Sequence, residues 1–311
     1  MILALSIEIQ DILGELKTST LVKPSIKLRK ENKIKTVHHS LAIEGNTLTE
    51  EQITALLEKK RVIGPKKHIQ EVQNALKLYD DINTLNPFSE KDLLKSHSLL
   101  MQDLVESSGR YRSTNVGIIK GNKVGHVAPQ AKVVSGHMKD LFAFMKSKDA
   151  IPLLIKACIF HYELEFIHPF EDGNGRMGRL WQQVLLMKHS EIFEFVSVES
   201  LIHKEQKKYY KVLEACDKAG NSTAFIEFSL ELILIAVKEF KNVYRPSKIT
   251  GVDRVRLALE TFGKSGFTRK EYLNLHKDIS TATASRDLAS AVGGKILVRL
   301  GDKALATYMA I

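Results

Sequence analysis

Residues 168–179 have the sequence HPFEDGNGRMGR, which places an imidazole, two carboxylates, a Gly-Asn-Gly turn and two arginines in one short stretch. The mostly apolar run before it, 152–167, is typical of a helix that Pro169 cannot continue. The run after it, 176–188, indicates a second helix. The turn between them would therefore expose backbone N–H groups at a helix N-terminus, which is an anion-binding position.

The two arginines and the histidine extend this prediction to chemistry. Arg176 and Arg179 are three residues apart, so on a helix they project from roughly one face and can hold phosphate oxygens in pairs. His168 would lie at the negative end of the preceding helix dipole, which favours the protonated imidazole. A single Gly-x-Gly or a single histidine is usually structural, but here all these groups occur together. The stretch predicts a site that binds a polyphosphate with its metal and deprotonates a nucleophile.

The stretch matches the pattern H-x-F-x-D/E-G-N-G-R-x-x-R at every position and so resembles the Fic family. The resemblance implies an enzyme that moves AMP from ATP to a Ser, Thr or Tyr hydroxyl of a target protein, or of itself. It implies that His168 is the general base and that Asp172 is the Mg²⁺ ligand. Phe170 is expected in the core. The residues that would bind the ATP phosphates are Gly173, Asn174, Gly175, Arg176, Gly178 and Arg179.

Two further segments resemble parts of the family site. Residues 109–129 resemble the β-hairpin flap whose edge strand pairs with the target backbone, and the expected docking residues are Gly121, Val124 and His126. Tyr209, Tyr210 and Asp217 stand where the family places its nucleoside contacts. Relatives often have Asn at the last of these positions, and two tyrosines on a helix also fit a purely structural role in the core.

An N-terminal segment resembles the family's inhibitory signature, S/T-x-x-x-E-G/N, with Ser40 and Glu44 at its fixed positions. Glu44 is expected to pair with Arg179, taking the cation and the space needed by the γ-phosphate. The alternative is an exposed i,i+4 pair on a helix that ends at Gly45. Some relatives use the same glutamate to activate water and remove AMP, so a reverse deAMPylation stays open.

Composition limits the remaining choices. A chain of 311 residues with 44% hydrophobic residues can form two or three compact units. No segment approaches the roughly 20 apolar residues of a membrane span, and the N-terminus lacks the pattern of a secretory signal. Cys158 and Cys216 are expected as buried thiols, which together with these features predicts a cytoplasmic protein without membrane contact.

The predicted fold is mainly α: a Fic helical core with a β-hairpin flap, and a C-terminal winged helix-turn-helix domain. The basic segment Lys17–Lys35 is expected to be a solvated arm. The predicted domains are an N-terminal helical region at 1–88, the catalytic core at 89–243, a linker at 244–251 and the winged-helix domain at 252–311. The predicted helices of the first two domains are 36–45, 49–60, 66–84, 89–106, 130–147, 152–167, 176–189, 203–218 and 222–243.

The C-terminal domain carries an excess of positive charge. Residues 245–311 contain 12 Lys and Arg against 6 Asp and Glu, which suits a nucleic-acid surface. Three helices are predicted at 253–262, 268–276 and 280–291, with Thr268 and Ser280 as N-caps, followed by a two-stranded wing at 296–300 and 305–309. DNA binding is one hypothesis for this domain, and protein docking or dimer stabilisation is the other.

The sequence leaves open two alternatives to ATP-dependent protein adenylylation. In the first, the chain is a DNA-binding regulator and the Fic core serves as a nucleotide sensor. In the second, the donor is another nucleotide such as UTP, because the motif fixes phosphate handling more firmly than base recognition. Relatives often pair through the helical core, so a homodimer is also a hypothesis.

Overall fold

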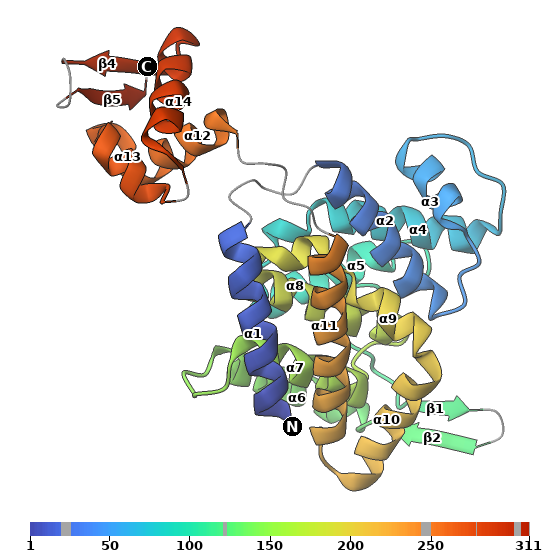
Figure 1. Ribbon diagram of the computed structural model, residues 1–311. Helices are drawn as coiled ribbons and strands as arrows, with labels where there is room; N and C mark the ends of the chain where they lie inside the picture. The colour runs from blue at the N-terminus through green and yellow to red at the C-terminus, as the bar shows by residue number, and fades with distance from the viewer. Residues whose placement is uncertain (20–25, 121–122, 244–249, 278, 302–305, 311) are drawn as a thin grey trace. The chain divides into compact units, whose positions relative to one another are not determined.

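The computed structural model describes residues 1–19, 26–120, 123–243, 250–277, 279–301 and 306–310. Contacts divide them into two compact units: the described residues of 1–14 and 25–243, and those of 15–24 and 244–311. Both units are largely helical, so the predicted mainly α class is confirmed (Figure 1). None of the helices described could cross a membrane, since none is both long and apolar enough.

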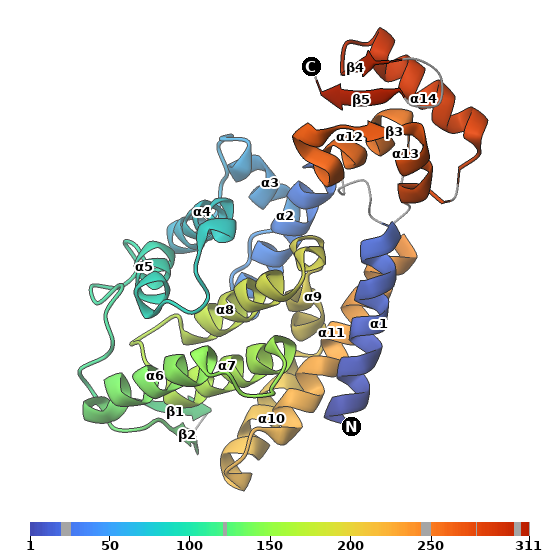
Figure 2. The same cartoon turned by 90° about the vertical axis from the view of Figure 1, so that its left-hand side faces the viewer.

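Two helices packed side by side form the centre of the first unit. α7 (Leu153–Ile167) packs along α8 (Asn174–His189), and α11 (Thr223–Val243) packs against α7. Both views place α1 (Ile2–Ser19) beside α11 (Figures 1 and 2), where Lys238 forms an ion pair with Glu8 at 2.6 Å. The remaining elements are α2 (Ile26–Ala42), α3 (Glu50–Leu57), α4 (Lys66–Asp80), η1 (Ile82–Thr84), α5 (Glu90–Leu100), β1 (Gly117–Lys120), β2 (Lys123–Val127), α6 (Ala131–Lys146), η2 (Glu191–Phe195), α9 (Val198–Lys204) and α10 (Gln206–Ala219).

The loop between α7 and α8 is short because the backbone turns sharply at both of its ends. His168 ends α7 in the left-handed conformation, with φ 49°, and Gly173 precedes α8 with φ 84°. Buried side chains fix the two helices below this loop, including Phe160, Leu164 and Trp181, each 0% exposed. The loop that contains the sequence motif is therefore held by a rigid helical pair.

The predicted basic arm at Lys17–Lys35 is wrong. Residues 2–19 and 26–42 are helical, and α2 buries Ile34 and Val37. Acidic groups from distant parts of the chain pair with the basic side chains: Arg29 with Glu194 at 2.8 Å and Lys33 with Asp80. Local composition cannot reveal such long-range partners, so the positive charge of the segment was misleading.

Several helix boundaries also differ from the prediction. The predicted helix 36–45 begins ten residues earlier, at Ile26, and that at 89–106 ends at Leu100. The short helix α9 was not predicted, because seven residues are too few for a clear apolar period. The other predicted helices of this unit agree with observed ones to within a few residues.

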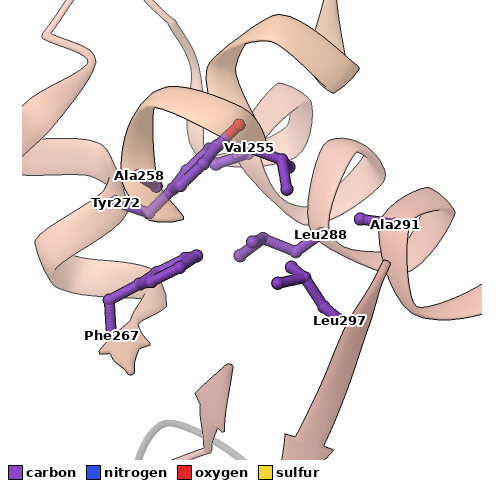
Figure 3. Packing of buried hydrophobic residues seen from close by; sticks show 8 residues of the cluster. Val255, Ala258, Phe267, Tyr272, Leu288, Ala291 and Leu297 are labelled. Carbon is purple, nitrogen blue, oxygen red and sulfur yellow. The ribbon is translucent and has the colours of Figure 1, made fainter. Parts of the chain in front are cut away.

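The second unit builds a small core of its own from three helices and a sheet. α12 (Gly251–Phe262), α13 (Arg269–Leu275) and α14 (Thr281–Gly293) are followed by β4 (Leu297–Leu300) and β5 (Thr307–Ala310). β5 lies between β4 and the short β3 (Phe267–Thr268) in an antiparallel sheet, and η3 (Gly263–Ser265) precedes β3. Thr268 and Ser280 cap α13 and α14 as predicted. The residues that form the core are Val255, Ala258, Phe267, Tyr272, Ala284, Leu288, Ala291 and Leu297 (Figure 3).

Candidate active site

His168 occupies the junction between α7 and the motif loop. Its backbone N–H completes the last turn of α7 by donating to Leu164 O at 3.0 Å. Its ring Nδ1 lies 3.3 Å from Glu165 O, and because a carbonyl can only accept, Nδ1 carries the proton. A neutral ring in this tautomer has its lone pair on Nε2, the atom that a general base needs.

Arg112 braces the same junction from outside the motif. It is 3% exposed, and its Nε donates to His168 O at 2.7 Å while Nη2 donates to Ile167 O at 3.3 Å. Its backbone N–H donates to Pro169 O at 2.9 Å. The guanidinium thus satisfies carbonyls at the negative end of α7 and fixes the position of His168.

Two side chains hold the loop from within. Asn174 accepts from the backbone N–H of Phe170 and donates to its carbonyl, both at 2.8 Å. The ring of His97 stacks on Phe170 with centroids 3.7 Å apart, and its Nε2 donates to Asp172 O at 3.0 Å. Phe170 is fully buried, which confirms its expected place in the core. Burial lowers the pKa of His97 to about 4, so this ring is a neutral support rather than a charge at the site.

Asp172 and Arg176 form a pair at the start of α8. The Arg176 Nη2 donates to Asp172 Oδ1 at 3.0 Å, and the same oxygen accepts from the Gly173 N–H at 2.6 Å. The Asp172 side chain is 48% exposed, whereas Arg176 is buried. Arg176 Nη1 also lies 3.4 Å from Glu71, a buried residue of α4 that sequence reasoning did not assign to the site.

Arg179 is 1% exposed and is held by the predicted inhibitory residues. Its Nε donates to Ser40 Oγ at 3.2 Å, and its Nη2 donates to Ser40 O at 3.0 Å and to Glu44 Oε1 at 2.6 Å. Burial tends to lower the pKa of Arg179, but nearby negative charge, chiefly that of Glu44, raises it above the usual value. The structure therefore brings Ser40, Glu44 and Arg179 together.

Gly175 allows Glu44 to approach the first turn of α8. A methyl group at position 175 would lie 2.5 Å from Glu44 Oε1 and 3.1 Å from Arg179 Nη1. No side chain larger than hydrogen fits while Glu44 is in place. The carboxylate thus lies against the backbone at the helix N-terminus, where an anion is favoured.

A buried polar network that the sequence did not reveal lies beneath Arg179. Tyr209 OH donates to Glu165 Oε1 at 3.0 Å and lies 3.1 Å from His161 Nε2. The other ring nitrogen of His161, Nδ1, lies 2.7 Å from Gln182 Oε1. His161 is fully buried, which confirms the expectation that it packs in the core, and burial lowers its pKa to about 3. Tyr209 is likewise buried, at 1% exposed.

The other predicted site residues lie in different surroundings. Tyr210 is half-buried beside Tyr209, and Asp217 accepts from Tyr162 OH at 3.1 Å. Val124 and His126 lie on β2, paired through the backbone with Ile119 and Ile118 of β1. Gly121 lies outside the described residues. Cys158 and Cys216 are both free and buried, as expected.

Two nitrogen atoms of the motif arginines remain without a partner among the residues that the structure describes. Arg176 Nε and Arg179 Nη1 are buried and make no hydrogen bond there. An unpaired buried donor costs about 1–3 kcal/mol, so such donors are retained where a ligand supplies the acceptor. Both arginines therefore fit a phosphate-bearing ligand.

Comparisons with known proteins agree with this geometry. Residues 87–186 match the Fic/DOC family. The fold is similar to a Fic family protein from Desulfovibrio desulfuricans G20, at 36% identity and a TM-score of 0.74, covering 100% of this chain and 95% of that one. It is also similar to Fic-1 from C. elegans, at 25% identity and a TM-score of 0.62, covering 75% and 70% of the two chains.

A curated relative, the protein adenylyltransferase Fic of Nematostella vectensis, is 31% identical over 219 residues. That match covers 66% of this chain and 48% of the relative, so the chain spans about half the length of the curated relatives it matches. The similarity to the bacterial structure extends over both chains almost completely. Together with the ordered motif at the α7–α8 junction, it shows that this chain belongs to the Fic family.

Proposed function

We propose that the chain transfers the AMP group of ATP to a hydroxyl of a target protein, and that Glu44 restrains this transfer. The observation that carries the proposal is the engagement of Arg179 by Ser40 and Glu44 directly over the first turn of α8. Because an acidic side chain of the same chain holds an arginine suited to bind phosphate, removing that side chain should free the arginine for the substrate.

The transfer requires a base, an anion site and charge neutralisation, and the motif residues can supply each. The target hydroxyl oxygen attacks the α-phosphorus, the bond from that phosphorus to the bridging oxygen breaks, and pyrophosphate leaves. His168 Nε2 takes the hydroxyl proton, with Nδ1 held by Glu165 O. Arg176 and Arg179 hold the outer phosphates and stabilise the leaving charge.

Asp172 fits the role of a Mg²⁺ ligand. Its carboxylate is half exposed at the mouth of the anion site, and Mg²⁺ is usually bound by one or two carboxylates together with phosphates and water. When bound, the ion would neutralise charge between phosphate groups. Displacement of the Arg176 contact at Asp172 Oδ1 would leave this arginine for the substrate.

We further propose that β1 and β2 act as the flap that aligns the target backbone. The nucleoside would lie toward Tyr210 and Asp217, since fully buried Tyr209 serves the network around Glu165 instead. With Glu44 as a base for water, the same site would also remove AMP from a modified target.

The test is intact-mass measurement after incubation with ATP and Mg²⁺, using Glu44→Gly as the active form. We expect one added AMP group on the chain or on a co-incubated target, and its loss in the Glu44→Gly/His168→Ala double variant. Equal labelling of the two variants would show that His168 is not the base. UTP in place of ATP tests the donor in the same experiment.

A second candidate function rests on the second unit. We propose that its order of three helices and an antiparallel sheet is a winged helix-turn-helix. α14 exposes Thr281, Ala282 and Arg286, and residues 245–311 carry twice as many basic as acidic residues. If the unit binds DNA, affinity for duplex should fall steeply with salt and vanish on deletion of 252–311. Binding that the deletion leaves unchanged would exclude this role.

A further inference from the structure

Three imidazoles and a carboxylate converge in the first unit. His38 and His39 lie near the C-terminal end of α2, Glu50 begins α3, and His203 lies on α9. His38 Nδ1 lies 3.6 Å from Glu50 Oε1, and His39 Nε2 lies 3.8 Å from the same oxygen. One ligand atom of each of these three residues lies within 4.8 Å of the other two.

These separations suit a metal better than hydrogen bonds. At 3.6 and 3.8 Å the two imidazole–carboxylate contacts are too long for good hydrogen bonds. Around a tetrahedral ion with bonds of about 2.0–2.2 Å, ligand atoms lie about 3.3 Å apart. The two contacts with Glu50 would shorten by a few tenths of an ångström, and the two imidazole nitrogens, which lie within 4.8 Å of each other, would approach further. His38 Nδ1 is buried and has no hydrogen-bond partner among the described residues.

A fourth polar group, His203 of α9, positions one ring of the cluster. His39 Nδ1 lies 3.2 Å from His203 Nδ1. If His39 donates in this bond, its Nε2 keeps a lone pair on the side of the Glu50 carboxylate, where one metal ion can bind both groups.

We propose that His38, His39 and Glu50 form a binding site for a divalent transition-metal ion such as Zn²⁺, with His203 orienting His39. Two imidazoles and one carboxylate are a ligand set that Zn²⁺ accepts, with a fourth position for water. The residues are 21–39% exposed, which allows entry of the ion without unfolding. His203 is a positioning residue, because it contacts His39 and not the ion.

The place of the site in the chain gives it a consequence for Glu44, which rests on the proposed function. The ligands flank the inhibitory segment, with His39 immediately before Ser40 and Glu50 six residues after Glu44. A bound ion would tie the two ends of this segment together and favour the contact of Glu44 with Arg179. Zn²⁺ should then lower AMP transfer by the wild type more than by Glu44→Gly.

The direct test is calorimetric titration of the chelator-stripped full chain with Zn²⁺, with metal content measured per chain. We expect one site that His38→Ala, His39→Ala and Glu50→Gln each abolish or weaken severely. His203→Ala should weaken binding by about 10–100-fold, as loss of an orienting partner does. The matched control is His137→Ala, which removes an exposed histidine of α6 and should leave affinity unchanged.

Circular dichroism of each stripped variant separates loss of a ligand from loss of fold, and Glu50→Gln keeps the shape of the side chain. X-ray absorption of the loaded chain should show two imidazole ligands with oxygen. Absence of Zn²⁺ binding, or binding unchanged in the His38→Ala/His39→Ala double variant, would overturn the proposal. Binding without any AMP transfer would instead contradict the proposed function and leave the metal site standing.

Discussion

At the scale of single residues, side chains of the chain itself engage both motif arginines. Arg179 is shared by a hydroxyl, a backbone carbonyl and the Glu44 carboxylate, while Arg176 lies between Asp172 and Glu71. Under the proposed function, a substrate that carries phosphate would have to replace the acidic partners. The free energy of those contacts would then set how strongly the resting chain resists ATP.

A graded series at Ser40 and Glu44 tests this competition. Glu44→Gly removes the 2.6 Å ion pair to buried Arg179, and we expect the rate of self-labelling by ATP to rise by about tenfold or more, equivalent to at least about 1.4 kcal/mol. Ser40→Ala removes only the hydroxyl contact and keeps the carbonyl one, so its effect should be smaller. The rates are measured with labelled ATP and Mg²⁺. A larger effect from Ser40→Ala than from Glu44→Gly would contradict the assignment of Glu44 as the main restraint.

Arg112 should act on His168 without touching the substrate. Arg112→Ala removes donors to the carbonyls of Ile167 and His168, so we expect kcat of the Glu44→Gly form to fall by about tenfold to a hundredfold, with little change in KM for ATP. Arg112→Lys should not restore kcat, because one ammonium group cannot replace the several donors of the planar guanidinium. Exposed Arg110→Ala is the control. A rise in KM alone would place Arg112 in substrate binding.

The residues of the motif can be recognised in the sequence, whereas the residues that support them cannot. His168, Asp172 and the two arginines occur within twelve residues, so one pattern reveals them all. Arg112 and Glu165 reach the same place through contacts made only in the folded chain, and no local pattern distinguishes them from other charged residues. The Ser40–Glu44 segment was recognisable only because its spacing resembles that of a known family.

At the scale of elements, the pairing of α7 with α8 positions everything else. Gly178 lets the two helices approach: a methyl group there would lie 2.8 Å from His161 Cδ2 and 3.4 Å from Glu165 Oε1. Both neighbours belong to the buried network, so neither can move without breaking a hydrogen bond. The glycine is a packing requirement of this crossing.

Gly178→Ala should accordingly destabilise the first unit although alanine favours helices. We expect a loss of about 1–3 kcal/mol in the free energy of unfolding, the usual result of overpacking. Gly136→Ala is the matched control, because this glycine of α6 has no neighbour within 4 Å and its replacement should stabilise by about 0.5–1 kcal/mol. Urea unfolding followed by the fluorescence of Trp181, the single tryptophan, measures both. If Gly178→Ala stabilises the unit as much as Gly136→Ala does, the helix crossing can accommodate a methyl group.

The contrast between predicted and observed helices has a physical cause. Long helices of mostly apolar sequence, such as 153–167 and 223–243, were predicted within one or two residues. α2 was missed over most of its length because its mean composition is polar, and its stability comes from burial of Val37 and Leu41 and from ion pairs with distant acids. Tertiary partners, which no local window contains, decide such a helix.

At the scale of the whole molecule, the chain has two separate hydrophobic cores. The first unit contains the motif loop, its supports and the Ser40–Glu44 segment, whereas the second has a separate core around Phe267 and Leu288. In the second unit a partly buried ion pair, Arg254 with Asp287 at 2.7 Å, links α12 to α14. Since Trp181 lies in the first unit, its fluorescence reports the unfolding of that unit.

The buried histidines of the first unit predict how its stability depends on pH. Burial lowers the pKa of His161 to about 3 and that of His97 to about 4, both below the unfolded value of about 6.5. The unfolded chain therefore binds more protons between these values, and the stability that the neutral rings contribute is complete above pH 6.5 and is lost as the pH falls. Each ring should contribute a slope of about 1.4 kcal/mol per pH unit.

Glu199 has the opposite effect on stability as the pH falls, so the experiment must remove its contribution. Burial raises its pKa to about 7, so its contribution is complete below the unfolded carboxyl value and is lost as the pH rises through 7. We therefore compare urea midpoints from pH 7.5 to 5.5 in a Glu199→Gln background, with and without His97→Gln and His161→Gln. The histidine substitutions should flatten the fall in stability on acidification, because the unfolded chain then loses two sites that take up protons. A slope that stays the same in the double histidine variant would mean that both rings are already protonated in the folded chain, and the neutral supports assigned beneath the motif loop would have to carry charge instead.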